Sequence, residues 1–261
     1  MVKALIGYTG FVGTTLMKQT QFDEHYRSTN INDIKGKKFD LVVCAGAPAQ
    51  KWIANADPQG DREKIDALIA CLDSIECETF ILISTVDVFK KPVEVDENTV
   101  IDTQDLHAYG LNRYRLEQFV EKKFPRHLIV RLPGLIGPGL RKNIIYDFLN
   151  DNNVEKIESR SVFQFYPMVN LWFDIEKALD KNIRLIHLTA EPVSVANIAR
   201  EGFGFEFSTH QTASPVSYDM RSIHGAVLGG SSHYQYSAKE TLQAVRHYAQ
   251  SEPKKIQEEK K

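Results

Sequence analysis

Cysteine is scarce in this sequence of 261 residues, and its spacing does not suit a metal site. Cys44, Cys71 and Cys77 form no CxxC pair, and the histidines show no HxxxH or HExxH spacing. We therefore expect no bound metal. A sparse, odd number of cysteines is typical of a reducing compartment. Free cysteines are commonly buried as small apolar side chains, and we expect that role here.

Long apolar runs and an excess of charge of one sign are also missing. No stretch approaches the roughly 20 apolar residues needed to span a bilayer. The apolar run Ala4 to Gly7 is too short for a signal peptide. The net charge of -2 argues against nucleic-acid binding, which usually needs a basic surface. We expect a cytoplasmic protein with no membrane or nucleic-acid partner.

What the sequence does contain is a regular alternation of apolar runs and amphipathic segments. Short apolar runs predict buried strands at residues 2–6, 39–45, 79–84, 127–132 and 185–188, with a short strand near 25–29. Helical spacing predicts helices at residues 14–20, 61–72, 109–123, 143–149, 171–179, 193–200 and 238–249. This alternation predicts an α/β fold, a doubly wound parallel sheet with helices on both faces.

A glycine-rich loop lies between the first predicted strand and the first predicted helix. Gly7, Gly10 and Gly13 form the pattern GxxGxxG. Glycine lets the backbone turn tightly and approach a phosphate, and the helix start offers unpaired N–H groups and partial positive charge. The loop therefore predicts a pyrophosphate site for a dinucleotide. A tight turn without a ligand is the alternative reading.

Four further segments, in order along the chain, extend the resemblance that this glycine spacing begins. Cys44 to Ala47 resembles an Ala/Gly segment beside a cofactor, and Ser84 to Phe89 resembles the strand end S-[ST]-x-x-V-[FY]. Tyr109 and Arg113 stand where YxxxK is expected, and Arg131 to Gly139 resembles R-x-x-x-[VI]-x-G-P-G. The chain thus resembles the extended short-chain dehydrogenase/reductase (NAD-dependent epimerase/dehydratase) family, and most of all its dTDP-4-dehydrorhamnose reductase type.

This resemblance implies an NAD(P)-dependent oxidoreductase, epimerase or dehydratase with a nucleotide sugar, or a similar carbonyl or alcohol, as substrate. It implies that Thr85 orients the substrate oxygen and that Tyr109 transfers the proton. Arg113 takes the position of the family's lysine. Arginine keeps the positive charge and can bind ribose, but it cannot pass protons. Two alternatives remain: a nucleotide-binding sensor or assembly partner with impaired chemistry, or a plain helix surface carrying Tyr109 and Arg113.

The resemblance also implies which residues contact each ligand. The expected cofactor-binding residues are Gly7, Thr9, Gly10, Phe11, Val12, Gly13, Arg27, Ala45, Gly46, Ala47, Tyr109, Arg113 and Pro133. The expected substrate-binding residues are Thr85, Val86, Asp87, Arg141 and Arg221. Arg27 slightly favours NADP over NAD, because no clear acid follows the second strand and a guanidinium matches a 2′-phosphate. Arg27, Arg141 and Arg221 are otherwise ordinary surface charges.

We expect three regions along the chain. Residues 1–140 form an NAD(P)-binding domain of the Rossmann type, and residues 141–251 form a small substrate-binding region that is partly interleaved with the sheet. Residues 252–261 are charged and lack an apolar face, so we expect a disordered tail. Related proteins often form homodimers through the helix that carries the tyrosine. Leu116, Phe119 and Val120 would form such a seam, or would face the sheet.

Overall fold

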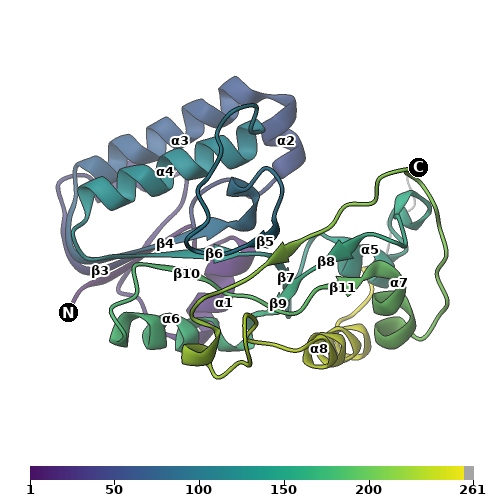
Figure 1. The fold of residues 1–261 in the computed structure, drawn as a ribbon. Helices are drawn as coiled ribbons and strands as arrows, with labels where there is room; N and C mark the ends of the chain where they lie inside the picture. The colour runs from purple at the N-terminus through teal and green to yellow at the C-terminus, as the bar shows by residue number, and fades with distance from the viewer. Residues whose placement is uncertain (256–261) are drawn as a thin grey trace.

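A computed structural model describes residues 1–255 of the chain and places a six-stranded parallel sheet at its centre (Figure 1). The strand order is β10-β6-β4-β3-β1-β2. The six strands are β1 (Lys3–Ile6), β2 (Glu24–Tyr26), β3 (Lys38–Cys44), β4 (Glu76–Thr85), β6 (His127–Leu132) and β10 (Leu185–His187). All five neighbouring pairs are parallel. The predicted fold class, a doubly wound parallel sheet, is confirmed.

Helices cover both faces of this sheet. Helices α3 (Pro58–Asp73) and α4 (Ala108–Lys123) lie on one face, and α1 (Phe11–Gln19) and α6 (Leu171–Asp180) lie on the other (Figure 1). All six residues of β6 are buried, which explains why this strand is continuously apolar apart from its two basic residues. Successive residues of a strand therefore enter two separate cores, one under each helical layer.

The inner side of α4 settles one of the alternatives left open by the sequence. Leu116 is 1% exposed and Val120 is fully buried, and both pack in the core between α4 and the sheet. Phe119 is partly buried against the same core. Leu116 and Val120 therefore face the sheet and are not available for a seam between two copies of the chain.

The remaining elements are short, and many of them form a smaller lobe beside the sheet (Figure 1). Its helices are α5 (Ile144–Asn150), α7 (Val195–Asn197) and α8 (Ala238–Ser251). Its strands pair as β7 (Gly134–Ile136) with β9 (Phe165–Pro167) and β8 (Val162–Phe163) with β11 (Val193–Ser194). Three further elements border the end of the sheet: α2 (Lys51–Ala56) and the paired strands β5 (Val93–Val95) and β12 (Asp219–Met220).

Two segments differ from their predicted form. The predicted helix at 193–200 begins as strand β11, and a π-helical turn over 198–203 follows α7. The first residues of the tail that was predicted to be disordered make hydrogen bonds to the rest of the chain. Glu252 accepts a hydrogen bond from the Gly139 N–H (3.2 Å), and the Lys255 N–H donates to Asn150 (2.7 Å). Residues 256–261 of the predicted tail lie outside the described part of the chain.

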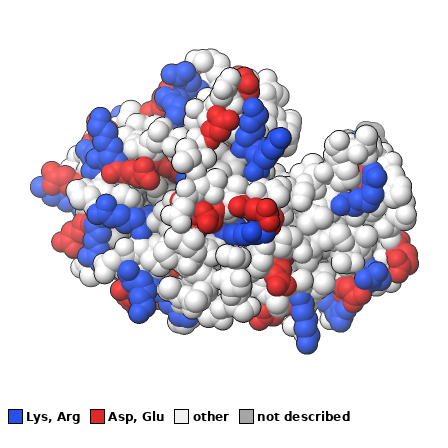
Figure 2. All heavy atoms as spheres, in the orientation of Figure 1, with Lys and Arg blue, Asp and Glu red and all other residues white. Residues whose placement is uncertain are grey.

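The surface carries mixed charge. Figure 2 shows lysines and arginines interspersed with acids on the face drawn there, which is hollowed between the larger body and the smaller lobe. Within residues 1–255, no helix is both long enough and apolar enough to cross a membrane. The same residues contain no group of three or more histidines, cysteines or acids placed to hold a metal ion.

Candidate functional site

The glycine loop lies where the order of the strands reverses. β1 has β2 on one side and β3 on the other, so the connections leave in opposite directions and a crevice opens at their carboxyl ends. Gly7 directly follows β1 with φ +85°. A Cβ at Gly7 would lie 2.3 Å from the Ala45 carbonyl oxygen, and one at Gly13 would lie 2.2 Å from the Gly7 carbonyl oxygen. These two positions require glycine.

Helix α1 begins directly after this loop. Its N-cap residue is Gly10, which makes no side-chain capping hydrogen bond. The N–H groups of the first turn, from Phe11 to Gly13, therefore point out of the helix start without a capping acceptor. Partial positive charge at this end favours an anion. The loop has the backbone of a phosphate cradle, and it fits the dinucleotide that the sequence predicts.

The segment after β3 forms the facing wall of the crevice. Gly46 lies so close to β1 that a Cβ there would be 2.8 Å from the Ile6 Cγ2 atom. Ala45 and Ala47 are half-buried beside it. Arg27, directly after β2, is exposed, and its Nε donates to the Thr29 hydroxyl (2.9 Å). The structure thus places Arg27 beyond the crevice edge formed by β2.

Thr85 and Tyr109 meet at the carboxyl end of β4. Thr85 is the last residue of that strand, and Tyr109 is the second residue of α4. A Cβ at Gly110 would lie 2.1 Å from the Asp87 carbonyl oxygen, so the first turn of α4 closely approaches the strand end. The Tyr109 N–H also donates to the Asn55 side chain of α2 (3.0 Å). As a result, the Thr85 hydroxyl lies beside the Tyr109 phenol, close enough to lower its pKa.

The groups around the Tyr109 phenol shift its pKa in opposite directions. Burial raises the pKa of Tyr109 above its ordinary value, and the Asp87 carboxylate raises it further. The Arg113 guanidinium and the Thr85 hydroxyl lower the same pKa. Tyr109 as a whole is only 9% exposed, so its ionised form depends on these neighbours more than on water.

Arg113 is a buried cation held by the protein itself. It is 3% exposed and pairs with Asp61, which is 4% exposed, at 2.5 Å. Its other terminal nitrogen donates to the Pro48 carbonyl oxygen, and its Cζ lies 4.0 Å from the centroid of the Tyr109 ring. Its Nε is buried without a hydrogen-bond partner. The reading of Tyr109 and Arg113 as plain helix surface is therefore wrong.

Asp87 gathers polar side chains from two other parts of the chain. Its carboxylate lies 2.7 Å from the Lys51 Nζ of α2, and it accepts a hydrogen bond from the Tyr218 hydroxyl (3.0 Å). The Asp87 N–H donates to the Thr85 hydroxyl (3.2 Å). One carboxylate thus links the predicted catalytic strand end, α2 and a segment more than 120 residues further along the chain.

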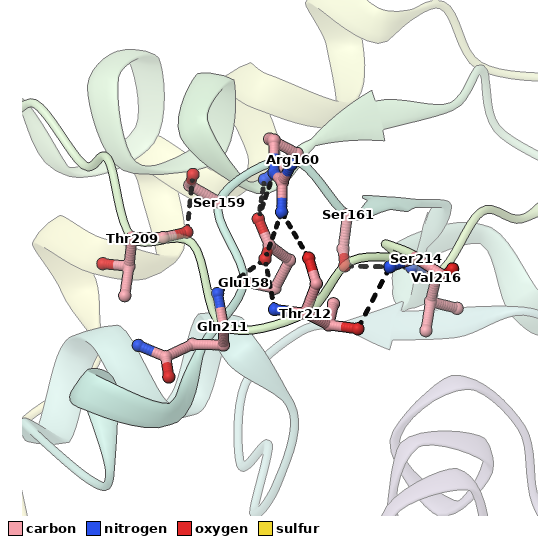
Figure 3. A network of polar contacts seen from close by, with 9 residues as sticks. All are labelled: Glu158, Ser159, Arg160, Ser161, Thr209, Gln211, Thr212, Ser214 and Val216. Atoms are coloured by element: carbon pink, nitrogen blue, oxygen red, sulfur yellow. Dashed lines mark hydrogen bonds and ion pairs between the residues drawn. The ribbon is translucent and has the colours of Figure 1, made fainter.

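A polar network holds the segment that leads to Tyr218 (Figure 3). The Glu158 carboxylate accepts hydrogen bonds from the Gln211 N–H (2.7 Å), the Thr212 N–H (3.1 Å) and the Arg160 guanidinium (2.8 and 2.9 Å). The Val162 carbonyl oxygen then accepts the Tyr218 N–H (3.0 Å). These contacts attach an irregular segment to the smaller lobe and direct Tyr218 toward Asp87.

Several predicted ligand residues do not converge on this site. Val86 is 4% exposed in an apolar cluster, and Pro133 is buried. Arg221 pairs with Glu94 (2.6 Å) and Asp219 (2.9 Å). Arg141 is exposed on the connection between β7 and α5. The structure therefore gathers Thr85, Asp87, Tyr109 and Arg113, but shows no contact between these residues and Arg141 or Arg221, the two arginines predicted to bind substrate.

Sequence reasoning missed four residues of the site: Lys51, Asn55, Asp61 and Tyr218. Lys51 and Asn55 belong to α2, a helix that the sequence did not predict. Asp61 occurs at the start of a predicted helix, where an acid is common and draws no attention. Tyr218 lies in a stretch without a periodic pattern. No sequence motif marks any of the four.

The fold and the site together define a doubly wound α/β protein of the Rossmann type, with a glycine cradle at its switch point and a threonine–tyrosine pair at the carboxyl end of β4. No family model matches the chain, and no curated protein matches it in sequence. Solved structures match it over nearly its whole length. The structures described next are all less than 20% identical to this chain, and their likeness to it shows a common fold.

Three of these structures illustrate the match. A dTDP-4-dehydrorhamnose reductase from Clostridium acetobutylicum is 17% identical, with a TM-score of 0.70 over 96% of this chain and 99% of that chain. The same type of reductase from Bacillus anthracis, in complex with NADP, is 15% identical, with a TM-score of 0.69 over 95% and 98%. A UDP-glucose 4-epimerase from Thermotoga maritima, solved with UDP-glucose, is 13% identical, with a TM-score of 0.68 over 96% and 99%.

Proposed function

We propose that this protein is an NAD(P)-dependent oxidoreductase or epimerase that acts on a nucleotide sugar or a similar carbonyl or alcohol. One observation carries the proposal: the end of β4 with Thr85 and the first turn of α4 with Tyr109 pack against each other, at the same edge of the parallel sheet as the glycine cradle. Structures with this fold include reductases and epimerases of nucleotide sugars, which supports the choice of substrate.

Thr85, Tyr109 and Arg113 have separate roles in this proposal. The Thr85 hydroxyl holds the substrate oxygen, and Tyr109 gives its phenolic proton to that oxygen when a carbonyl is reduced, or takes one when an alcohol is oxidised. The fixed Arg113 cation stabilises the phenolate left on Tyr109, because it lies against the ring. Arg113 does not release the proton, since a guanidinium has no accessible neutral form.

The glycine cradle and its neighbours would hold the coenzyme. The N–H groups of the first turn of α1 would contact its pyrophosphate, and the unpartnered Nε of Arg113 would donate to a ribose hydroxyl. When bound, the coenzyme supplies or accepts the hydride. Arg27 supports NADP over NAD, because its exposed guanidinium beyond β2 suits a 2′-phosphate. Comparing the Kd of NADP with that of NAD in the wild type and in Arg27→Ala tests this preference.

The substitution Tyr109→Phe tests the proposed chemistry. It removes one hydroxyl from a buried ring and keeps the ring's packing on Arg113, so we expect turnover to fall by at least about 100-fold. The Kd of NADP, measured by thermal shift or fluorescence, should stay within about twofold of wild type. Hydride transfer to a panel of nucleotide sugars is the readout, and unchanged turnover in this variant contradicts the proposal.

The second candidate is a nucleotide-binding sensor or assembly partner without hydride transfer. The sequestration of Arg113 by Asp61 favours it, because the lysine position of the family carries no free amine here. Wild-type protein that binds NADP or NAD but transfers no hydride with any nucleotide sugar would decide for this candidate. Arg113→Lys would then restore turnover only if the remaining site is intact.

A further inference from the structure

The Asp87 carboxylate opposes the proposed chemistry unless its charge is balanced. Tyr109 must carry a negative charge for part of each cycle. Asp87 adds a negative charge beside it, because the backbone of Asp87 packs directly on Gly110, the residue that follows Tyr109. Arg113 cannot balance both, because its terminal nitrogens are already bound to Asp61 and to carbonyl oxygens. A second cation is needed close to Asp87.

Lys51 is the cation that the fold brings to Asp87. Its Nζ lies 2.7 Å from the Asp87 carboxylate and 3.4 Å from the Tyr218 hydroxyl. Its side chain is 38% exposed, whereas Asp87 is 17% exposed, so the ammonium lies at the water-facing side of the pair. A cation at 2.7 Å turns the field of a carboxylate into that of a compact dipole, which decays faster with distance than the field of a single charge.

We propose that Lys51 is a positioning residue that neutralises Asp87 and so allows Tyr109 to ionise. This inference rests on the proposed function, in which Tyr109 exchanges a proton with the substrate. Lys51 acts through Asp87 and does not touch the reacting atoms. Two residues thereby share the role proposed for a single lysine. Arg113 places a fixed positive charge against the Tyr109 ring, and Lys51 places a second one on Asp87.

Other charged and titratable groups around Tyr109 also influence its ionisation. They come from α3, α4, the turn after β4 and the segments that precede β12 and α5. They are Asp61, Asp87, His107, Arg113, Lys142 and Tyr218. None of them is changed in the variants below except Asp87.

The test compares the ionisation of Tyr109 in coenzyme-free protein. Phenolate absorbance is titrated in each variant and in the same variant with Tyr109→Phe, and the difference isolates Tyr109. We expect Lys51→Met to raise the pKa of Tyr109 by about one pH unit and Asp87→Asn to lower it. The double variant should return it to the wild-type value or below. Lys38→Met, which breaks an exposed ion pair with Glu76 far from the site, should leave it unchanged.

Turnover provides the second readout. In the reductive direction, the limb of the kcat profile that falls at high pH should move upward in Lys51→Met and back in the double variant, with the Kd of NADP unchanged. Equal Tyr109 pKa values in wild type and Lys51→Met, or a rise that persists in the double variant, overturn the inference. The titration needs no turnover, so its result is independent of whether hydride transfer, and with it the proposed function, is found.

Discussion

At the scale of single residues, the buried pair of Arg113 and Asp61 fixes a positive charge against the Tyr109 ring. The guanidinium reaches Asp61, Pro48 and the Tyr109 backbone at once, which the single nitrogen of a lysine cannot do. The Asn112 side chain donates to the same Asp61 oxygen (2.8 Å). Asp61 therefore fixes the charge that lies under the Tyr109 ring.

Breaking this pair should be costly. Asp61→Asn leaves a buried guanidinium without its counter-charge, and we expect the free energy of unfolding to fall by about 3–5 kcal/mol. Asp66→Asn is the matched control, because Asp66 pairs with Arg115 at 2.9 Å on the surface and is 46% exposed. The control should change stability by less than about 1 kcal/mol. Urea unfolding measures both, and equal losses would contradict this account of Arg113.

The positions of Thr85 and Tyr109 in the fold were easier to predict from the sequence than the residues that contact them. Thr85 and Tyr109 follow a strand end and open a helix, so their places in the fold were predictable from local patterns. Asp61 lies 52 residues before Arg113, and Tyr218 lies 131 residues after Asp87. Such contacts depend on the packing of whole elements, and no local pattern of the chain carries that information.

At the scale of elements, long and strongly patterned segments were predictable and short ones were not. The predicted helix at 109–123 differs by one residue from α4, and the predicted strand at 127–132 is β6. Strands β8 and β11 have two residues each, too few to show any alternation. Helix α2 was missed because its N-cap, Gln50, makes no side-chain capping bond.

One element-scale prediction concerns the segment attached by Glu158. Glu158→Gln removes the charge that accepts the Arg160 guanidinium and two N–H groups, so we expect residues 205–216 to detach more often. Limited proteolysis should cleave this segment at least about threefold faster than in wild type. Glu155→Gln, an exposed neighbour, is the control. An unchanged cleavage rate would show that the other hydrogen bonds and the apolar contacts hold the segment without the Glu158 charge.

At the scale of the whole molecule, a buried histidine joins the sheet to the segments around it. His187, in β10, contacts Arg131 of β6 at 3.3 Å and the Arg221 carbonyl oxygen at 2.9 Å. The backbone N–H of His187 donates to the Glu97 carboxylate (2.8 Å). Burial lowers the pKa of His187 to about 4, although Glu97 opposes this shift.

This histidine predicts a loss of stability in acid. Above pH 6.5, His187 is neutral in both the folded and the unfolded chain, and its contribution is complete. As the pH falls from 6.5 to about 4, the unfolded chain binds the proton first and stability is lost, by up to roughly 3 kcal/mol. His187→Gln should lose less over this window, and the exposed His210→Gln should behave as wild type. Urea midpoints measured between pH 7 and pH 4 check this, and parallel curves for His187→Gln and wild type would contradict it.

Strand β10 also has a consequence for how the molecule is made. It is the edge strand of the central sheet, yet it is encoded after α5, α6 and most of the smaller lobe's strands. During synthesis, one edge of β6 has no pairing strand until residue 187 has left the ribosome. The region that carries the glycine cradle therefore completes its sheet late, and the nascent chain exposes an open strand edge for more than 50 residues of translation.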